Sequence, residues 1–459
     1  MSDILAPAMF ACLFVALFAG FPVAFSLAAV AGVFGAVGLA TGDFNVSFLN
    51  NMLFRIQGTF NNDNLLALPM LIFMGMLLER TGIAEDLFVA LNRLFGRLSG
   101  GLAYTTVIVG GVLSAITGFV SASVVAIGLI ALPVMLRAKY DPRLATGVVA
   151  ASGTLAQVIP PSLVLIILAE QLDVSLIEIY RGALLPSALL ISSYLVYIFV
   201  ITQLVPERAP PSVRVEGDSS TVSTAIAAAA VTAGPPLGIV LAMLAAIYFG
   251  VATPSEGGAF GVTATLILAL AKRKLTGRNL RRAMDVTGVL CSGIIFLLLG
   301  ASFFTLVFRG LDGQVWIESL FRHIPAGQIG FILFINVAIF FLAFFLDFFE
   351  IAFIVLPLIA PVARQLGIDM VWLTVLLAVN LQTSFMHPPF GIALYNLRSV
   401  APLSVRTSQI YWGAIPFLAL QVLMVGLLIV APQIVTKAPP SKIEWNTRQI
   451  ELPPPPDDP

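Results

Sequence analysis

Residues 133–162 read PVMLRAKYDPRLATGVVAASGTLAQVIPPS, and a related stretch, PVARQLGIDMVWLTVLLAVNLQTSFMHPPF, follows at residues 361–390. A shift of 228 positions superimposes three landmarks: Pro133 on Pro361, Asp141 on Asp369, and Pro160-Pro161 on Pro388-Pro389. Each copy predicts a turn and an apolar helix that is interrupted by two prolines, because proline lacks an N–H and clashes with the preceding helical turn. Interrupted apolar segments at corresponding positions of two halves are the best sequence indication of a transport site.

The composition is typical of a polytopic membrane protein. Of the 459 residues, 59% are hydrophobic and only 10% are charged, whereas about 25% of the residues in a soluble domain are charged. Many apolar stretches reach the roughly 20 residues needed to cross a bilayer. We expect an all-α protein, because lipid tolerates no open sheet edge. The net charge of zero gives no indication of nucleic-acid binding.

The repeat divides the chain into two halves. We expect a first repeat at 1–204, a polar linker at 205–220, a second repeat at 221–435 and a flexible tail at 436–459. Each half is predicted to hold about five crossing helices, one re-entrant hairpin (101–136 and 328–363) and one broken helix (143–168 and 371–396). The strongest basic cluster lies at 272–282, and its counterpart at 44–54 has no basic residue. Because positive charge marks the cytoplasmic side, this asymmetry predicts that the two halves are inverted in the membrane.

Two further segments bear on the architecture. Residues 4–19 and 23–41 are interpreted as two spans joined by a tight turn, with one long kinked helix as the alternative. Residues 84–97 and 314–322 are predicted to be amphipathic helices at the membrane interface.

The first interruption carries oxygen-bearing side chains. The freed backbone carbonyls, with Thr154, Gln157 and Ser162, are hard ligands suited to Na⁺, and the C-terminal ends of half-helices favour cations. The alternative is a structural kink packed by small residues. Pro160 and Pro161, which create the interruption, are candidates for substrate binding or gating.

The second interruption differs in its side chains. Gln382, Thr383 and Ser384 precede it and are candidate Na⁺ ligands. His387, directly before Pro388-Pro389, is interpreted either as a hydrogen-bonded structural residue or as a group for proton coupling or substrate binding. The two prolines are candidates for substrate binding or gating, as in the first copy.

The predicted hairpin tips, 117–123 and 345–350, also contain polar side chains. Asp347 and Glu350 lie in an otherwise apolar run, where a carboxylate is by default a functional-site candidate. We expect Asp347 to bind an ion and Glu350 to take part in gating or substrate binding. Ser121 and Ser123 at the other tip are candidate Na⁺ ligands.

Several classes of enzyme are excluded by missing motifs. The sequence has no GxxxxGK[ST], no HExxH and no Cys/His metal spacing. ATP hydrolysis within this chain is therefore not expected, and no organic cofactor is predicted.

Four stretches resemble one family across nearly the whole chain to about residue 435. They read LLALPMLIFMGMLLERTGIAEDL (65–87), GVVAASGTLAQVIPPS (147–162), TPSEGGAFG (253–261) and NLQTSFMHPPFGIALY (380–395). The chain resembles the large membrane subunit of TRAP (tripartite ATP-independent periplasmic) transporters, in the form often labelled mannitol/chloroaromatic-type. One departure is His387, which stands where many relatives carry Thr.

The resemblance implies a multi-pass protein of the bacterial inner membrane that imports organic anions, with Na⁺ as the coupling ion. It also implies a small membrane subunit of about four helices, a periplasmic substrate-binding protein, and an elevator mechanism in which a transport domain slides against a scaffold. Carried over by position, the Na⁺ sites would lie where the hairpin tips meet 153–162 and 382–389. Two alternatives remain: a self-sufficient ion-coupled anion carrier of similar hairpin architecture, and an intramembrane enzyme using Asp347 and His387.

Overall fold

The computed structural model describes residues 2–43, 45–80, 82–96, 98–211, 222–322, 327–346, 348–388 and 391–436. These residues form helices and turns without any strand, so the predicted all-α class is confirmed. Most of the linker expected at 205–220 and almost all of the tail expected at 436–459 lie outside the described residues. The same holds for Asp347 and Pro389.

The first half contains eleven α-helices in the described residues. They are α1 (Ser2–Phe18), α2 (Val23–Thr41), α3 (Val46–Leu49), α4 (Asn51–Phe60), α5 (Asp63–Arg80), α6 (Ile83–Phe95), α7 (Gly101–Thr117), α8 (Val120–Arg137), α9 (Pro142–Thr154), α10 (Leu163–Leu172) and α11 (Leu176–Leu204).

The second half contains ten α-helices in the residues that the structure describes. They are α12 (Val222–Tyr248), α13 (Pro254–Ala271), α14 (Gly277–Gly310), α15 (Gly313–Arg322), α16 (Gly327–Leu342), α17 (Phe348–Glu350), α18 (Leu356–Gln365), α19 (Met370–Ser384), α20 (Ile392–Val400) and α21 (Thr407–Val430). A π-helical segment at Ile351–Val355 joins α17 to α18.

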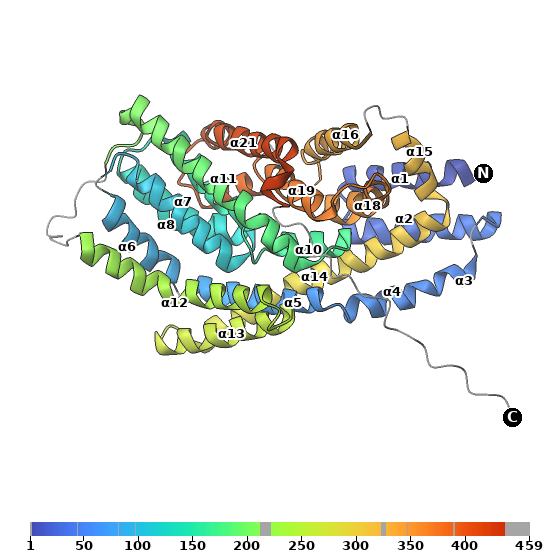
Figure 1. The fold of residues 1–459 in the computed structure, drawn as a ribbon, viewed down its shortest axis with the longest axis horizontal. Helices are drawn as coiled ribbons and strands as arrows, with labels where there is room; N and C mark the ends of the chain where they lie inside the picture. Colours follow the sequence, from blue (N-terminus) through green and yellow to red (C-terminus); the bar gives the residue numbers. More distant parts are fainter. Residues whose placement is uncertain are drawn as a thin grey trace, which may run out of the picture.

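The N-terminal apolar region is two helices and not one kinked helix. Gly20 has a φ of +82° between α1 and α2, a conformation that glycine adopts without steric cost. The two helices then lie side by side (Figure 1, blue).

The apolar helices fall into two length classes, those long enough to cross a membrane and those that are too short. Among the described residues, seven helices are long and apolar enough to cross a membrane, or eight if the pair 47–60 and 63–79, bent by 48°, forms one span. The apolar helices next to the interruptions are shorter: Gly101–Thr117, Leu163–Leu172, Gly327–Leu342 and Met370–Ser384. None of these reaches the roughly 20 residues of a complete crossing.

The two interrupted helices form the centre of the molecule. Every residue of α9 from Leu144 to Thr154 is buried, and so is every residue of α19 from Trp372 to Ser384. A helix that is buried on all sides belongs in a protein core and not at a lipid surface. Among the long helices, α11 packs on α19 and on α21 (Figure 1).

The repeat landmarks Asp141 and Asp369 have the same local role. Asp141 accepts a hydrogen bond from the Arg143 N–H at the start of α9, and Asp369 accepts one from the Trp372 N–H at the start of α19. Both carboxylates therefore cap free N–H groups at a helix N-terminus.

The beginning of the predicted linker packs against the protein. Ala209 is fully buried, and its carbonyl accepts hydrogen bonds from Ser99 Oγ and the Gly100 N–H. The Asp141 N–H donates to the carbonyl of Arg208. The segment that leaves α11 is thus fixed at the base of α7 and α9.

Candidate functional site

The first interruption separates α9 from α10 by a 3-10 turn at Leu155–Gln157 and the two prolines. Ser162 spans this gap: its hydroxyl donates to the Gln157 carbonyl (2.6 Å) and accepts from the N–H groups of Val164 (3.1 Å) and Leu165 (3.4 Å). Ser162 is therefore the N-cap of α10 and holds the two half-helices in a fixed relation.

The tip between α7 and α8 lies directly on this interruption. Gly118, with a φ of +60°, accepts a backbone hydrogen bond from the Leu163 N–H at 3.4 Å. A Cβ atom at Gly118 would lie 2.9 Å from the carbonyl oxygen of Pro161. On the other side, a Cβ atom at Gly75 of α5 would lie 2.8 Å from Thr117 Cα. Close backbone packing thus holds the tip between α5 and the interruption.

The turn is shorter than the 117–123 predicted from the sequence. Only Gly118 and Phe119 separate the two helices, because Val120 already begins α8. Ser121 is half-buried in the first turn of α8. Ser123 is fully buried and shares a 2.6 Å hydrogen bond with Thr117, so it ties both arms of the tip together.

The second interruption begins where α19 ends. The hydroxyls of Thr383 and Ser384 donate within the helix to the carbonyls of Asn380 and Leu381, each at 2.6 Å. Their oxygen lone pairs are not used by these bonds. Pro388 follows and is half-buried. The chain is then held by a bond from the Gly391 N–H to the His387 carbonyl.

A cavity of about 90 Å³ lies between this interruption and the turn after α16. It is lined by Ala343, Phe344 and Leu346 of the turn and by Ser384 and Phe385 of the interruption. The turn after α16 covers 343–346 in the described residues, and Phe348 already begins α17. The sequence had predicted this tip at 345–350, which is a few residues too far along the chain. Glu350 lies in α17 and lines a different cavity, of about 250 Å³, together with Phe119 and Leu163.

His387 is packed by aromatic rings. Its imidazole stacks on Phe344 (centroids 4.3 Å apart) and meets the edge of Phe340 (4.5 Å). The ring is fully buried, and neither nitrogen has a hydrogen-bond partner among the described residues, although the Ala343 backbone lies beside it. Because the Ala343 backbone lies close enough to interact with the ring, both interpretations of His387, as a structural residue and as a group for proton coupling or substrate binding, stay predictions.

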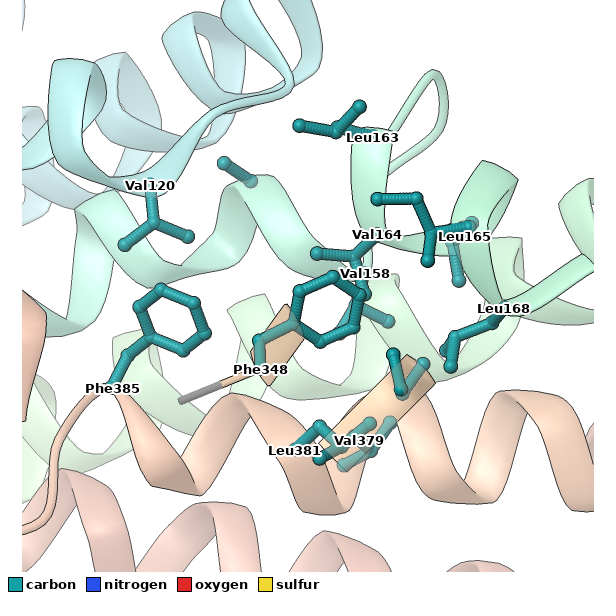
Figure 2. Packing of buried hydrophobic residues seen from close by; sticks show 14 of the residues in the cluster. Val120, Val158, Leu163, Val164, Leu165, Leu168, Phe348, Val379, Leu381 and Phe385 are labelled. Atoms are coloured by element: carbon teal, nitrogen blue, oxygen red, sulfur yellow. The ribbon is translucent and has the colours of Figure 1, made fainter. Parts of the chain in front are cut away.

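Apolar side chains from both halves close the space between the interruptions. Figure 2 shows Phe348 and Phe385 of the second half among Val120, Val158 and Val164 of the first half. Phe348 is 1% exposed and Phe385 8% exposed. Polar groups in this region are therefore shielded from bulk water.

A polar cluster links the two interrupted helices. Gln382 Nε2 donates to Thr154 Oγ1 at 3.3 Å, and Gln421 Nε2 of α21 lies 3.4 Å from the same oxygen and 2.9 Å from the Tyr194 hydroxyl of α11. Thr154 donates its own proton to the Ala151 carbonyl at 2.8 Å, so it acts as an acceptor toward both amides.

Sequence reasoning missed Gln421 and Tyr194. A polar amide inside an apolar span was an available signal for Gln421. No local pattern indicates that Tyr194 is its partner, because the two residues are 227 positions apart.

Three buried amide oxygens at this centre have no hydrogen-bond donor in the described part of the chain: Gln157 Oε1, Gln382 Oε1 and Gln421 Oε1. Gln157 Nε2 is also without a partner there. An unsatisfied buried amide costs about 1–3 kcal/mol, so such groups in a native protein require an explanation. Neutral oxygens of this kind are hard donors that fit an alkali cation.

Comparison with solved structures shows a related fold. The chain is similar to the YdaH transporter of Alcanivorax borkumensis, whose crystal structure was described as having an unusual topology, with a TM-score of 0.61 and 14% identity. The similarity covers 89% of this chain and 96% of that one.

Curated relatives are permeases. The chain is 26% identical to the C4-dicarboxylate TRAP transporter large permease protein DctM of Pseudomonas aeruginosa (84% of this chain, 88% of the relative). It is 26% identical to the sialic acid TRAP transporter large permease protein SiaM of Vibrio cholerae (91% and 94%). It is also 26% identical to the ectoine/5-hydroxyectoine TRAP transporter large permease protein UehC of Ruegeria pomeroyi (94% and 97%).

The family match covers almost the whole chain. Residues 10–434 match the family described as "Tripartite ATP-independent periplasmic transporter, DctM component". The matched family and the curated relatives are transport permeases and not enzymes. The chain belongs to the DctM family and is the multi-pass inner-membrane large permease subunit of a TRAP transporter.

Proposed function

We propose that this subunit imports an organic anion in symport with Na⁺, and that a periplasmic binding protein delivers the anion. We also propose that it works with a small membrane subunit of about four helices. The names of the relatives support this proposal, since they are TRAP permeases for C4-dicarboxylates, sialic acid and ectoines.

The observation that carries Na⁺ coupling is the buried amide of Gln157. It lies at the end of the 3-10 turn after α9, where backbone carbonyls are released from the helix, and neither of its polar atoms has a partner among the described residues. Helix C-termini favour cations. At the first interruption, Gln157 and neighbouring carbonyls would hold Na⁺, with Ser121 and Ser123 on the adjoining tip. Ser162 would keep the half-helices in place.

The second Na⁺ site would lie at the other interruption. Thr383 and Ser384 have unused oxygen lone pairs, and Ser384 lines the cavity of about 90 Å³. Asp347 and Pro389 are expected beside it but lie outside the described residues. Na⁺ at both interruptions would offset the negative charge of the organic anion that enters this region.

We further propose an elevator mechanism between two inverted repeats. The interrupted helices α9 and α19 are buried on all sides, while the long helices expose broad apolar surfaces. Such buried helices can slide within a lipid-facing frame without exposing their backbone polar groups to lipid.

A second possibility, proton coupling, is favoured by one observation. Both nitrogens of the buried His387 ring are without partners in the described residues. A histidine in this state can take up a proton when a neighbouring anion arrives. The protonated His387 ring would then take the place of Na⁺ at the second interruption.

The test is thermal unfolding of the purified two-subunit complex, with NaCl titrated against choline chloride at constant ionic strength. Binding to the folded state alone stabilises it by RT ln(1 + [L]/Kd), so Na⁺ should raise the unfolding midpoint saturably. Gln157→Leu should reduce the shift, whereas Gln365→Leu, which changes an exposed amide at the end of α18, should not.

Two other results would change the assignment. If the NaCl and choline curves coincide and the midpoint depends on pH only while His387 is present, the coupling ion is a proton. If proteoliposomes take up the anion at full rate without the binding protein, the subunit is a self-sufficient carrier.

A further inference from the structure

A cavity of about 250 Å³ lies between α11 and α12, and Pro160 of the first interruption also lines it. Ile177 and Tyr180 of α11 line one wall, and Leu244 and Ala245 of α12 line the other. All the lining residues are aliphatic or aromatic. The cavity therefore suits a hydrocarbon chain better than a hydrated solute.

The cavity opens at a surface of exposed apolar side chains, as expected for a face in contact with lipid. Among the lining residues, Leu184 is 52% exposed, Leu241 62% and Phe249 74%. The cavity also lies near helix ends, because α11 begins at Leu176 and α12 ends at Tyr248. Tyrosine is enriched at the level of the lipid headgroups, and Tyr248 is the last residue of α12. A lipid can thus enter from the bilayer with its headgroup at the interface.

One polar group lies within the apolar wall. The Tyr180 hydroxyl is buried and has no hydrogen-bond partner among the described residues. A buried hydroxyl without a partner is unfavourable by about 1–3 kcal/mol. A ligand that brings an acceptor oxygen into the cavity would remove this cost.

A cationic group stands at the mouth. Arg181 Nη2 donates to the Tyr248 carbonyl at 2.9 Å, and the guanidinium lies 4.3 Å from the centre of the Tyr248 ring. Its side chain is exposed, and it forms no ion pair with a carboxylate in the part of the chain that the structure describes. Because a guanidinium has five N–H donors, several remain for an anionic ligand such as a phosphate.

We infer that this cavity binds a phospholipid with an anionic headgroup. One acyl chain occupies the apolar cavity, an ester carbonyl accepts the hydrogen bond of Tyr180, and the phosphate pairs with Arg181. The bound lipid holds α12 against α11 and the first interruption, and so stabilises this conformation of the permease. This inference does not depend on the identity of the coupling ion.

The experiment uses the delipidated two-subunit complex in detergent and two lipids with identical acyl chains, phosphatidylglycerol and phosphatidylcholine. Phosphatidylglycerol should raise the unfolding midpoint saturably and remain bound in native mass spectrometry. Phosphatidylcholine, whose headgroup has no net charge, should bind more weakly. Arg181→Gln should raise the apparent Kd for phosphatidylglycerol by about tenfold, as expected for losing one charge-assisted hydrogen bond.

Two further variants separate the parts of the site. Ala245→Trp should fill the cavity and abolish retention of both lipids, while Tyr180→Phe should weaken both several-fold. Arg278→Gln, at an exposed arginine in α14, is the control and should behave as the wild type.

Either of two outcomes would overturn the inference. One is equal phosphatidylglycerol binding by Arg181→Gln and Arg278→Gln. The other is retention of the lipid by a folded Ala245→Trp variant. If Ala245→Trp does not fold, the comparison of the two arginine variants still gives the answer.

Discussion

Gln382 donates a hydrogen bond to Thr154 at 3.3 Å, and these two residues are separated by the same 228 positions that superimpose the two halves of the sequence. Counterpart residues of two repeats can touch only near an axis that relates the repeats. The contact therefore supports the proposed two-fold relation. It also shows that the C-terminal ends of α9 and α19, where the two interruptions begin, lie against each other.

Thr154→Val should destabilise the folded complex by about 1–3 kcal/mol, because the substitution leaves the buried N–H groups of Gln382 and Gln421 without their common acceptor. The midpoint of thermal unfolding in detergent measures the effect. Thr263→Val is the control, since that exposed hydroxyl bonds to the Ala259 carbonyl alone among the described residues. Equal midpoints for the two variants would show that the cluster contributes no stability.

Gly118→Ala should move the first hairpin tip off the interruption and reduce the Na⁺-dependent shift of the unfolding midpoint. The new methyl group would meet the Pro161 carbonyl at 2.9 Å and would also require a left-handed conformation that costs roughly 1–2 kcal/mol. Gly20→Ala shares the positive φ but has no atom within 4 Å of the new Cβ. A loss of the Na⁺ response in both variants would attribute the effect to backbone strain alone.

His387→Leu should leave the unfolding midpoint unchanged or raise it, while uptake into proteoliposomes falls. The substitution removes two buried nitrogens that lack partners among the described residues, and stability gained at such a position is typically offset by lost function. Uptake is measured with the substrate that the binding protein delivers. Full uptake combined with a lower midpoint would mean that the imidazole serves packing against Phe340 and Phe344.

Asp141→Ala and Asp369→Ala should each lower stability by about 1 kcal/mol, because each removes the N-cap of an interrupted helix. The asparagine variants at the same positions retain a capping oxygen and should stay close to the wild type. Unfolding midpoints of the four variants provide the comparison. If the alanine and asparagine variants match, capping does not explain the presence of aspartate in both copies.

Local signals account for the features that could be predicted. The membrane class, the helical structure and both interruptions follow from long apolar runs and from the steric effect of adjacent prolines. The second turn was placed too late because the run IFFLAFFLDFFEIAF contains neither Gly nor Pro. Without such residues, hydropathy alone does not locate a turn.

The candidate site was predictable only in part. Ser162, Thr383 and Ser384 lie at the two interruptions, as their positions beside the proline pairs predict. Their hydroxyl protons are used in local hydrogen bonds that a sequence does not reveal. The first linker residues pack against the start of α7 through the buried Ala209, whose carbonyl accepts a hydrogen bond from Ser99. No sequence pattern around Ala209 predicts this contact.

By itself the sequence determined that this protein lies in the membrane and that an interrupted helix recurs after 228 positions, because hydrophobic length and proline sterics act over neighbouring residues. Only the tertiary structure decided which side chains meet at the centre. Thr154, Gln382 and Gln421 come from segments as much as 267 positions apart. Their pairing depends on how α9, α19 and α21 pack against one another, since each hydroxyl proton and each amide N–H must find its acceptor in three dimensions.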